Sequence, residues 1–246
     1  MCSITPDRYD AVLFDMDGVL TATAHLHAVA WKRMFDEVLR ERAQQSNEAF
    51  HPFDLDADFR IHVDGRRRHD GVRRFLESRG ITIPPGTPDS PAHEISHHGL
   101  GNRKDALVSA VLQSEGVEVY QGSIRFLHHV RRQGIRTAVV SSSRNCRAVL
   151  SAAGIEGLFD VRVDGVVADE RNIPGKPDPA MFLEAARALS VLPPRAAVIE
   201  DALSGVAAGR AGGFGLVVGI VRANDAAALR DAGADVVVAD LGPWAA

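Results

Sequence analysis

The part of the sequence after about residue 120 repeats one pattern, in which a short apolar run is followed by an amphipathic stretch. This repetition restricts the fold more than any other feature. The apolar runs indicate buried strands at 135–140, 159–163, 196–200, 215–221 and 235–239. Helical patterns lie between or beside them at 122–134, 146–154, 178–190, 202–213 and 224–234. Such an alternation is typical of a mainly parallel sheet with helices on both faces, so we predict an α/β, Rossmann-like core.

One further strand of this buried type, at 11–14, is isolated in the sequence, because no similar strand follows it for more than a hundred residues. The stretch between carries helical patterns at 25–43, 70–80 and 103–116, and a proline-rich segment at 81–93 that should be an exposed loop. We therefore predict that a small helical domain, residues 25–114, is inserted into a core made of residues 1–24 and 115–246.

Polar side chains follow three of the predicted strands at the point where each strand ends. Asp15 follows 11–14, Ser141 follows 135–140, and Glu200 and Asp201 end 196–200. In an open parallel sheet these carboxyl ends share one edge, and ligands bind in the crevice there. Lys176 lies in a proline-flanked loop just before a predicted helix. Each residue alone is more simply a turn, cap or surface residue, but their placement at one edge predicts an active site.

Composition excludes several classes of function. The net charge of −4 gives no general attraction to nucleic acid, and no apolar run approaches the length of about 20 residues that spans a bilayer. The first residues lack the pattern of a signal peptide. Cys2 and Cys146 form neither a disulfide framework nor a metal cluster, and are interpreted as a terminal thiol and a small helical residue. We expect a cytoplasmic protein with no nucleic-acid or membrane partner.

Two short motifs at first indicate other functions, a zinc site and nucleic-acid binding, but neither motif fits that function well. His93 to His97 match the zinc-protease pattern H-E-x-x-H, but Pro91 and Gly99 leave room for two helical turns at most, so we predict no zinc site. The basic residues from Arg66 to Arg74 have no interleaved aromatic residues. They fit a phosphorylated small molecule better than nucleic acid.

The polar segments together resemble the four motifs of the haloacid dehalogenase superfamily, in order. These segments are "DMDGVL", the serine of "VVSSS", the lysine of "PGKPDP", and "IEDALSG". The resemblance spans roughly residues 10–24 and 115–240, and a helical cap inserted after the first motif is also typical of the superfamily. Within it, the chain is most similar to the β-phosphoglucomutase group, through "HLHAVAWKRMF", "VDGRRRHDGV" and "SSSRN".

Phosphoryl transfer explains the types of residue in these motifs. It requires a nucleophile, a proton donor and acceptor, and positive groups around the phosphate. Asp15 is predicted to attack phosphorus and become an aspartyl-phosphate, and Asp17 to act as general acid and base after a turn that Gly18 permits. Ser141 and Lys176 are predicted to hold the transferring phosphoryl group. The cofactor is predicted to be Mg²⁺, a hard ion that prefers oxygen ligands. Its ligands are expected to be Asp15, the backbone carbonyl of Asp17 and Asp201, with Glu200 as a direct or indirect partner.

The resemblance also implies residues that bind the substrate. His27, Arg68 and Lys104 match contacts made by the cap of this group, with Arg68 at the distal phosphate. Ser143, Arg144 and Asn145 match positions that line its sugar-phosphate site. The chain departs from the group's pattern at Ala22, at Ala202 and in a longer loop at 83–101, so the fit of the substrate is left open.

The function implied is that of a Mg-dependent mutase. It would interconvert β-glucose 1-phosphate and glucose 6-phosphate through an aspartyl-phosphate and a bisphosphate intermediate. A sugar-phosphate phosphatase of the same superfamily is the alternative, because the chemistry of the core is shared. A non-enzymatic, receiver-like phosphoacceptor is more remote, because receiver domains are shorter and place the acidic pair before the acceptor. The expected partner is a small phosphorylated sugar, and the expected oligomeric state is a monomer.

Overall fold

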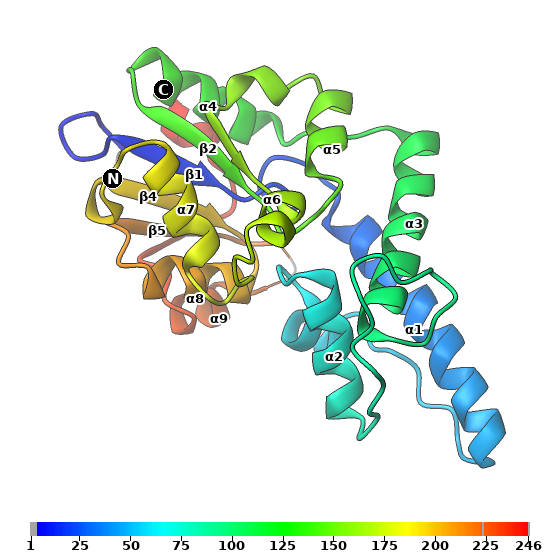
Figure 1. Ribbon diagram of the computed structural model, residues 1–246. Coiled ribbons are helices and arrows are strands. Elements are labelled where there is room, and N and C mark those ends of the chain that lie inside the picture. Colours follow the sequence, from blue (N-terminus) through cyan, green and yellow to red (C-terminus); the bar gives the residue numbers. More distant parts are fainter. Residues whose placement is uncertain (1–3, 223, 246) are drawn as a thin grey trace. The chain divides into compact units, whose positions relative to one another are not determined.

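The computed structural model describes residues 4–222 and 224–245, so Cys2 lies outside the described residues. The chain divides into two compact units (Figure 1). One, the core unit, runs from the N-terminus to Thr23 and from Val117 to the C-terminus, and the other, the helical unit, runs from Ala24 to Gly116.

The core unit contains a parallel sheet. Among the described residues its strands form one six-stranded sheet in the order β3-β2-β1-β4-β5-β6, and every neighbouring pair is parallel. The strands are β1 (Ala11–Phe14), β2 (Arg136–Val140), β3 (Val161–Val163), β4 (Ala196–Glu200), β5 (Leu216–Ile220) and β6 (Val236–Val238). Because β1 pairs with β2 on one side and with β4 on the other, the strand that lies far away in sequence becomes central in space. The predicted α/β fold class is confirmed.

Helices cover both faces of this sheet. They are α4 (Gln121–Arg132), α5 (Cys146–Ala152), α6 (Gly165–Glu170), α7 (Ala180–Ala188), α8 (Leu203–Ala211) and α9 (Ala226–Asp231). Leu13 and Val198 belong to one buried cluster with Met181 of α7 and Val206 of α8. The next residue after Leu13, Phe14, points the other way, and its ring meets Phe126 of α4 edge-on at 6.1 Å. This alternation along the strand explains why the strands are apolar on both sides.

One helix of the core was not expected from the sequence. α6 has only six residues, too few for an apolar period to be visible. It begins because the side chain of Asp164 accepts hydrogen bonds from the backbone N–H groups of Val166 and Val167, at 3.0 Å each.

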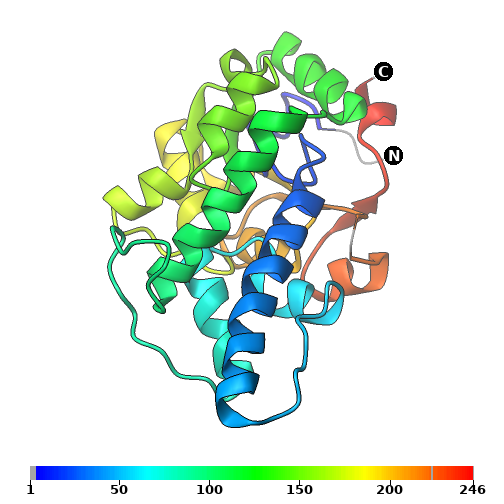
Figure 2. The same ribbon diagram turned by 90° about the vertical axis from the view of Figure 1, so that its right-hand side faces the viewer.

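The helical unit is built around aromatic residues. It contains α1 (Ala24–Ser46), a π-helical turn (Phe59–Val63), α2 (Arg68–Ser78) and α3 (His97–Glu115), and Figures 1 and 2 show α1 and α3 side by side. Phe35 stacks on Trp31 at 5.2 Å and lies 4.2 Å from Phe75 of α2, measured between ring centroids. Trp31 is therefore a core residue. Residues 81–93 form no helix or strand, as predicted.

α3 begins six residues before its predicted start at residue 103. Ser96 caps the helix, because its hydroxyl accepts a hydrogen bond from the backbone N–H of Gly99 at 3.0 Å. His97 is the first helical residue and His93 is exposed in the preceding turn. The H-E-x-x-H match therefore does not place its two histidines on one helix.

Within the described residues, no helix combines the length and the hydropathy needed to cross a lipid bilayer.

Candidate active site

Asp15, Ser141 and Glu200 lie at the carboxyl ends of β1, β2 and β4. The backbone N–H of Asp15 donates to the carbonyl oxygen of Ile199 at 2.9 Å, which continues the ladder between β1 and β4 by one residue. The N–H of Ser141 likewise donates to the carbonyl oxygen of Val163 at 3.0 Å. These backbone hydrogen bonds fix the positions of Asp15 and Ser141 relative to the sheet. The site is buried, since Asp15 is 6% and Glu200 0% exposed.

Lys176 lies at the centre of this group. Its Nζ donates to Asp15 Oδ1 at 2.5 Å, to Glu200 Oε1 at 2.6 Å and to the carbonyl oxygen of Val140 at 3.0 Å. The three bonds use every hydrogen of the ammonium group. The ring of Phe182 lies 4.9 Å from Nζ and helps to exclude water. The lysine thus links the ends of β1, β2 and β4 with one buried charge.

The buried charges shift each other's protonation. Burial alone would lower the pKa of Lys176, but Asp15 and Glu200 outweigh burial and raise that pKa above its ordinary value. Burial raises the pKa of Asp15 well above its usual range; Lys176 opposes this shift, and the charges of Glu200 and Asp17 add to it. A cation beside Asp15 would favour its ionised form.

Glu200 and Asp201 are positioned by the turn that follows β4. Glu200 Oε2 accepts hydrogen bonds from the backbone N–H groups of Asp201 and Ala202, at 2.9 Å each, while Oε1 accepts from Lys176. A Cβ atom at Gly205 would lie 1.6 Å from Glu200 Oε1, so only glycine leaves room for this carboxylate. Both oxygens of Glu200 are therefore held within the protein.

One group of side chains could hold a metal ion. Oxygen atoms of Asp15, Glu200 and Asp201 lie within 4.8 Å of one another, and among the described residues this is the one such group of side chains. A Cβ atom at Gly18 would lie 1.9 Å from Asp201 Oδ2, so the turn after β1 leaves the carboxylate its space only because Gly18 has no side chain. An all-carboxylate donor set fits a hard divalent cation and does not fit a soft one.

Asp17 lies in the turn after β1. The N–H of Gly18 donates to the carbonyl oxygen of Thr21 at 2.8 Å, which closes the turn. Asp17 Oδ1 accepts a short hydrogen bond from the hydroxyl of Thr23, and that hydroxyl lies 2.7 Å from the hydroxyl of Thr21. The two threonines were not singled out from the sequence, where they read as ordinary loop residues. Thr23 holds the side chain of Asp17, and Thr21 in turn contacts Thr23.

The loop after β2 is ordered by its own serines. Ser141 Oγ accepts from the N–H of Ser143, and Ser143 Oγ accepts from the N–H of Asn145, both at 3.1 Å. Arg144 Nη1 forms an ion pair with Asp169 Oδ2 of α6 at 3.2 Å. Arg144 and Asn145 line a cavity of about 550 Å³. The loop thus presents hydroxyl, guanidinium and amide groups on the core unit.

Of the predicted residues in the helical unit, Lys104 contacts His27, whereas Arg68 contacts other polar residues of α3. Lys104 Nζ donates to His27 Nδ1 at 2.8 Å and lies 5.2 Å from the ring of Trp31. Because an ammonium can only donate, Nδ1 accepts and the histidine proton is on Nε2. Arg68 is 7% exposed, and its guanidinium contacts Asn102 and Asp105.

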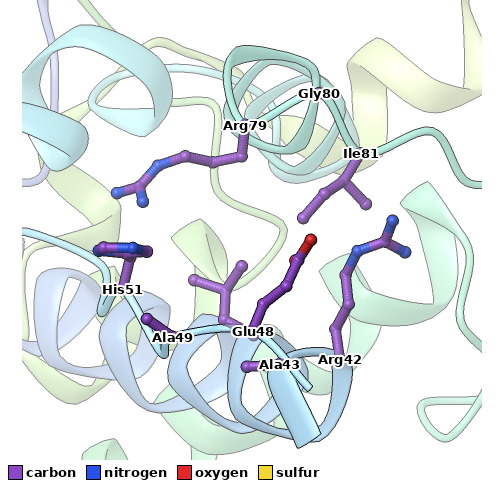
Figure 3. A pocket seen from close by; sticks show the side chains of 9 residues that line it. Arg42, Ala43, Glu48, Ala49, His51, Arg79, Gly80 and Ile81 are labelled. Carbon is purple, nitrogen blue, oxygen red and sulfur yellow. The ribbon is translucent and has the colours of Figure 1, made fainter. Parts of the chain in front are cut away.

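A second cavity, of about 350 Å³, lies in the helical unit where α1 and α2 end (Figure 3). Arg42, Glu48 and Arg79 surround it, with Ile81 on its apolar side. None of the predicted site residues lines this cavity. The candidate active site is therefore identified by the chemistry of its side chains and not by this cavity.

Comparison with known proteins places the chain in a family. Residues 9–213 match the family model described as haloacid dehalogenase-like hydrolase. The chain is 54% identical over 239 residues to a protein of Mycobacterium bovis named β-phosphoglucomutase, covering 96% of this chain and 91% of that protein. It is 31% identical to the validoxylamine A 7'-phosphate phosphatase of Streptomyces hygroscopicus subsp. limoneus, covering 95% and 94%.

Solved structures support the same fold. The chain aligns with a β-phosphoglucomutase structure from Clostridium difficile with a TM-score of 0.73 and 24% identity, covering 96% of this chain and 92% of that one. Family match, sequence identity and fold therefore agree. The chain is an enzyme that belongs to the haloacid dehalogenase superfamily and, within it, to the β-phosphoglucomutase-like subfamily.

Proposed function

We propose that this enzyme is a Mg-dependent phosphosugar mutase that interconverts β-glucose 1-phosphate and glucose 6-phosphate. The observation that carries the proposal is the buried Asp15 carboxylate, which Lys176 joins to Glu200 and which is followed two residues later by Asp17, held by Thr23. The 54% identity to a protein named β-phosphoglucomutase supports the choice of substrate and reaction.

Asp15 is the proposed nucleophile. Lys176 donates to Oδ1 and so orients the carboxylate for attack on phosphorus. When the bisphosphate is the donor, the P–O bond to its C1 oxygen breaks as the new bond forms, that oxygen takes a proton from Asp17, and glucose 6-phosphate leaves. In the other half of the cycle, the Asp17 carboxylate removes a proton from the 6-hydroxyl of β-glucose 1-phosphate, whose oxygen attacks the aspartyl-phosphate, so that the bisphosphate forms and the Asp15 carboxylate is released. Lys176 and Ser141 orient the phosphoryl group.

The proposed metal ligands are Asp15, Asp201 and the backbone carbonyl of Asp17. Glu200 supports them indirectly, because both of its oxygens are engaged by Lys176 and backbone N–H groups. Bound Mg²⁺ would neutralise charge on the phosphate.

Removal of divalent metal should abolish activity. We expect a chelator to stop turnover, Mg²⁺ to restore it, and Zn²⁺ to be unnecessary, because the ligand oxygens are hard donors. Coupled assay of glucose 6-phosphate after dialysis against chelator measures the effect. Full activity in the metal-free enzyme would contradict the metal assignment.

The helical unit is proposed to act as the cap, with the boundaries 25–114 predicted above. Arg68, Lys104 and His27 would then bind the substrate from the cap, and Ser143, Arg144 and Asn145 from the core. We also propose that the enzyme is a monomer and that it acts in the cytoplasm.

A sugar-phosphate phosphatase is the alternative function, and the 31% identity to a protein named as a phosphatase favours it. Both enzymes form the aspartyl-phosphate, and they differ in what receives the phosphoryl group. A mutase must also hold a bisphosphate in two orientations, so that each phosphate in turn faces Asp15 while the other is neutralised elsewhere. The guanidinium of Arg68 suits that second task.

Replacing Arg68 with alanine should separate the two functions. If the enzyme is a mutase, Arg68→Ala should reduce glucose 6-phosphate formation by about 30- to 1000-fold and reduce phosphate release far less, because the bisphosphate loses its distal contact and escapes. Both products are measured from β-glucose 1-phosphate primed with the bisphosphate. Arg73→Ala is the matched control, since Arg73 is an exposed arginine on the same helix that pairs with Glu77. Equal small losses in both activities would favour the phosphatase.

A further inference from the structure

The side chain of Asn102 joins two features of the helical unit that are far apart in sequence. Its Oδ1 accepts hydrogen bonds from Arg68 Nε at 3.1 Å and from Arg68 Nη2 at 2.9 Å, across 34 residues. Its Nδ2 donates to the carbonyl oxygens of Pro88 and Ser90, at 3.1 and 2.8 Å. Asn102 therefore lies between α2 and the α2–α3 loop, which we define as residues 79–96.

The orientation of this amide is determined by its partners. A guanidinium only donates hydrogen bonds and a backbone carbonyl only accepts them. The oxygen must therefore face Arg68 and the nitrogen must face the loop, because the reverse would bring donors against donors and acceptors against acceptors. Two accepted and two donated bonds use the full capacity of the amide. Asn102 cannot turn toward one partner without losing the other.

The α2–α3 loop is itself held firmly to α3. Arg103 Nε donates to the carbonyl oxygen of Ala92 at 2.8 Å, and the N–H groups of His97 and His98 donate to the carbonyl oxygens of Pro84 and Pro85, at 3.0 and 3.1 Å. This loop overlaps the segment 83–101, in which the sequence departs from the pattern of the subfamily. It can serve as a fixed support for Asn102.

Arg68 needs such a support because a carboxylate competes for its charge. Asp105 Oδ2 lies 3.2 Å from Arg68 Nε, and the arginine is 7% exposed, so water weakens this attraction little. A Cβ atom at Gly101 would lie 2.9 Å from Arg68 Cγ, so the side chain also passes close to the backbone of α3. Without Asn102, the amide oxygen no longer balances the attraction of Asp105 for the guanidinium.

We propose that Asn102 is a positioning residue that ties Arg68 to the α2–α3 loop and so sets the orientation in which the guanidinium meets the distal phosphate of a sugar bisphosphate. The inference rests on the proposed function for its substrate, whereas the link between Asn102 and Arg68 stands on the contacts alone. The α2–α3 loop thereby affects how the substrate fits, because the side-chain amide of Asn102 connects it to Arg68.

A double-mutant cycle tests the link. We expect Asn102→Ala to raise the KM for β-glucose 1,6-bisphosphate by about 10- to 100-fold, the effect of losing hydrogen bonds to a charged group, with kcat changed by less than about 3-fold. In an Arg68→Ala background, Asn102→Ala should have no further effect, because it acts through that guanidinium. Alanine is a good helix former, so α3 is expected to persist. Additive losses in the double variant would overturn the proposal.

Arg103→Ala is the matched control, because it removes a bond between the same helix and the same loop without touching Arg68. It should leave the KM for the bisphosphate within about 3-fold of wild type, as most substitutions of this kind do. An increase equal to that of Asn102→Ala would assign the effect to loop anchoring and overturn the proposal.

A spectroscopic measurement separates this inference from the proposed function. In the enzyme without substrate, Asn102→Ala should shift the Nε–Hε resonance of Arg68 in ¹⁵N-edited NMR spectra, and Arg103→Ala should not. If the wild-type enzyme only hydrolyses sugar phosphates, the proposed function fails while this resonance still tests the link. An unchanged Arg68 resonance in Asn102→Ala would refute the link whatever the reaction is.

Discussion

Asp15→Asn should abolish turnover while leaving the fold intact. An amide cannot attack phosphorus to form an acyl-phosphate, so the loss should be on the order of 10⁴-fold or more, as for other enzymes that lose a covalent nucleophile. The fold should persist because asparagine has nearly the same shape, can still accept from Lys176, and leaves Glu200 to balance the lysine charge. Phosphoenzyme is measured by intact-protein mass spectrometry, and the fold by circular dichroism.

Asp178→Asn serves as the matched control for that experiment. Asp178 lies in the same loop as Lys176, is exposed, and accepts a hydrogen bond from the backbone N–H of Ala180. Its substitution should change activity little. Detectable phosphoenzyme in Asp15→Asn would show that another residue is the nucleophile.

Lys176→Met should both inactivate and strongly destabilise the enzyme. Methionine leaves the carboxylates of Asp15 and Glu200 buried without their cation, and removing one partner of a buried charged group costs about 3–5 kcal/mol. This is a large part of the total stability of a typical domain, about 5–15 kcal/mol. The free energy of unfolding, measured in urea, gives the result directly.

Two further variants identify the cause of that destabilisation. Lys32→Met removes a partly exposed lysine paired with Asp36, and should cost about 1 kcal/mol or less. Lys176→Met combined with Glu200→Gln should recover part of the lost stability, because one buried negative charge is gone, but should recover no activity. A stability of Lys176→Met within about 1 kcal/mol of wild type would mean that the cluster is not held by its lysine.

The strands were predictable from the sequence because they are buried on both faces and follow one another at regular intervals. β1 was predicted at its observed bounds, 11–14, and the polar residues at the strand ends followed from the rule that parallel strands share one edge. The order of the sheet then brings Asp15 to Lys176, 161 residues away. Pattern and topology together predicted that these two side chains lie near each other.

Other features depend on contacts that leave no periodic signal. α6 is too short for a period, and the start of α3 depends on one serine cap after a proline-rich loop. The threonine that holds Asp17 and the asparagine that holds Arg68 were missed for the same reason. Each acts through a single hydrogen-bonded contact, and a polar residue in a loop or at a helix end has the same appearance in sequence whether or not it makes one.

The most direct test of the proposed reaction is to identify the product made by the purified enzyme. With Mg²⁺ and β-glucose 1-phosphate, and with β-glucose 1,6-bisphosphate added as primer, ³¹P NMR should show glucose 6-phosphate accumulating with little inorganic phosphate. Without primer the same conversion should begin slowly, since the first aspartyl-phosphate has no other donor than the substrate. Release of inorganic phosphate with no glucose 6-phosphate, even in the primed reaction, would contradict the mutase and identify the enzyme as a phosphatase.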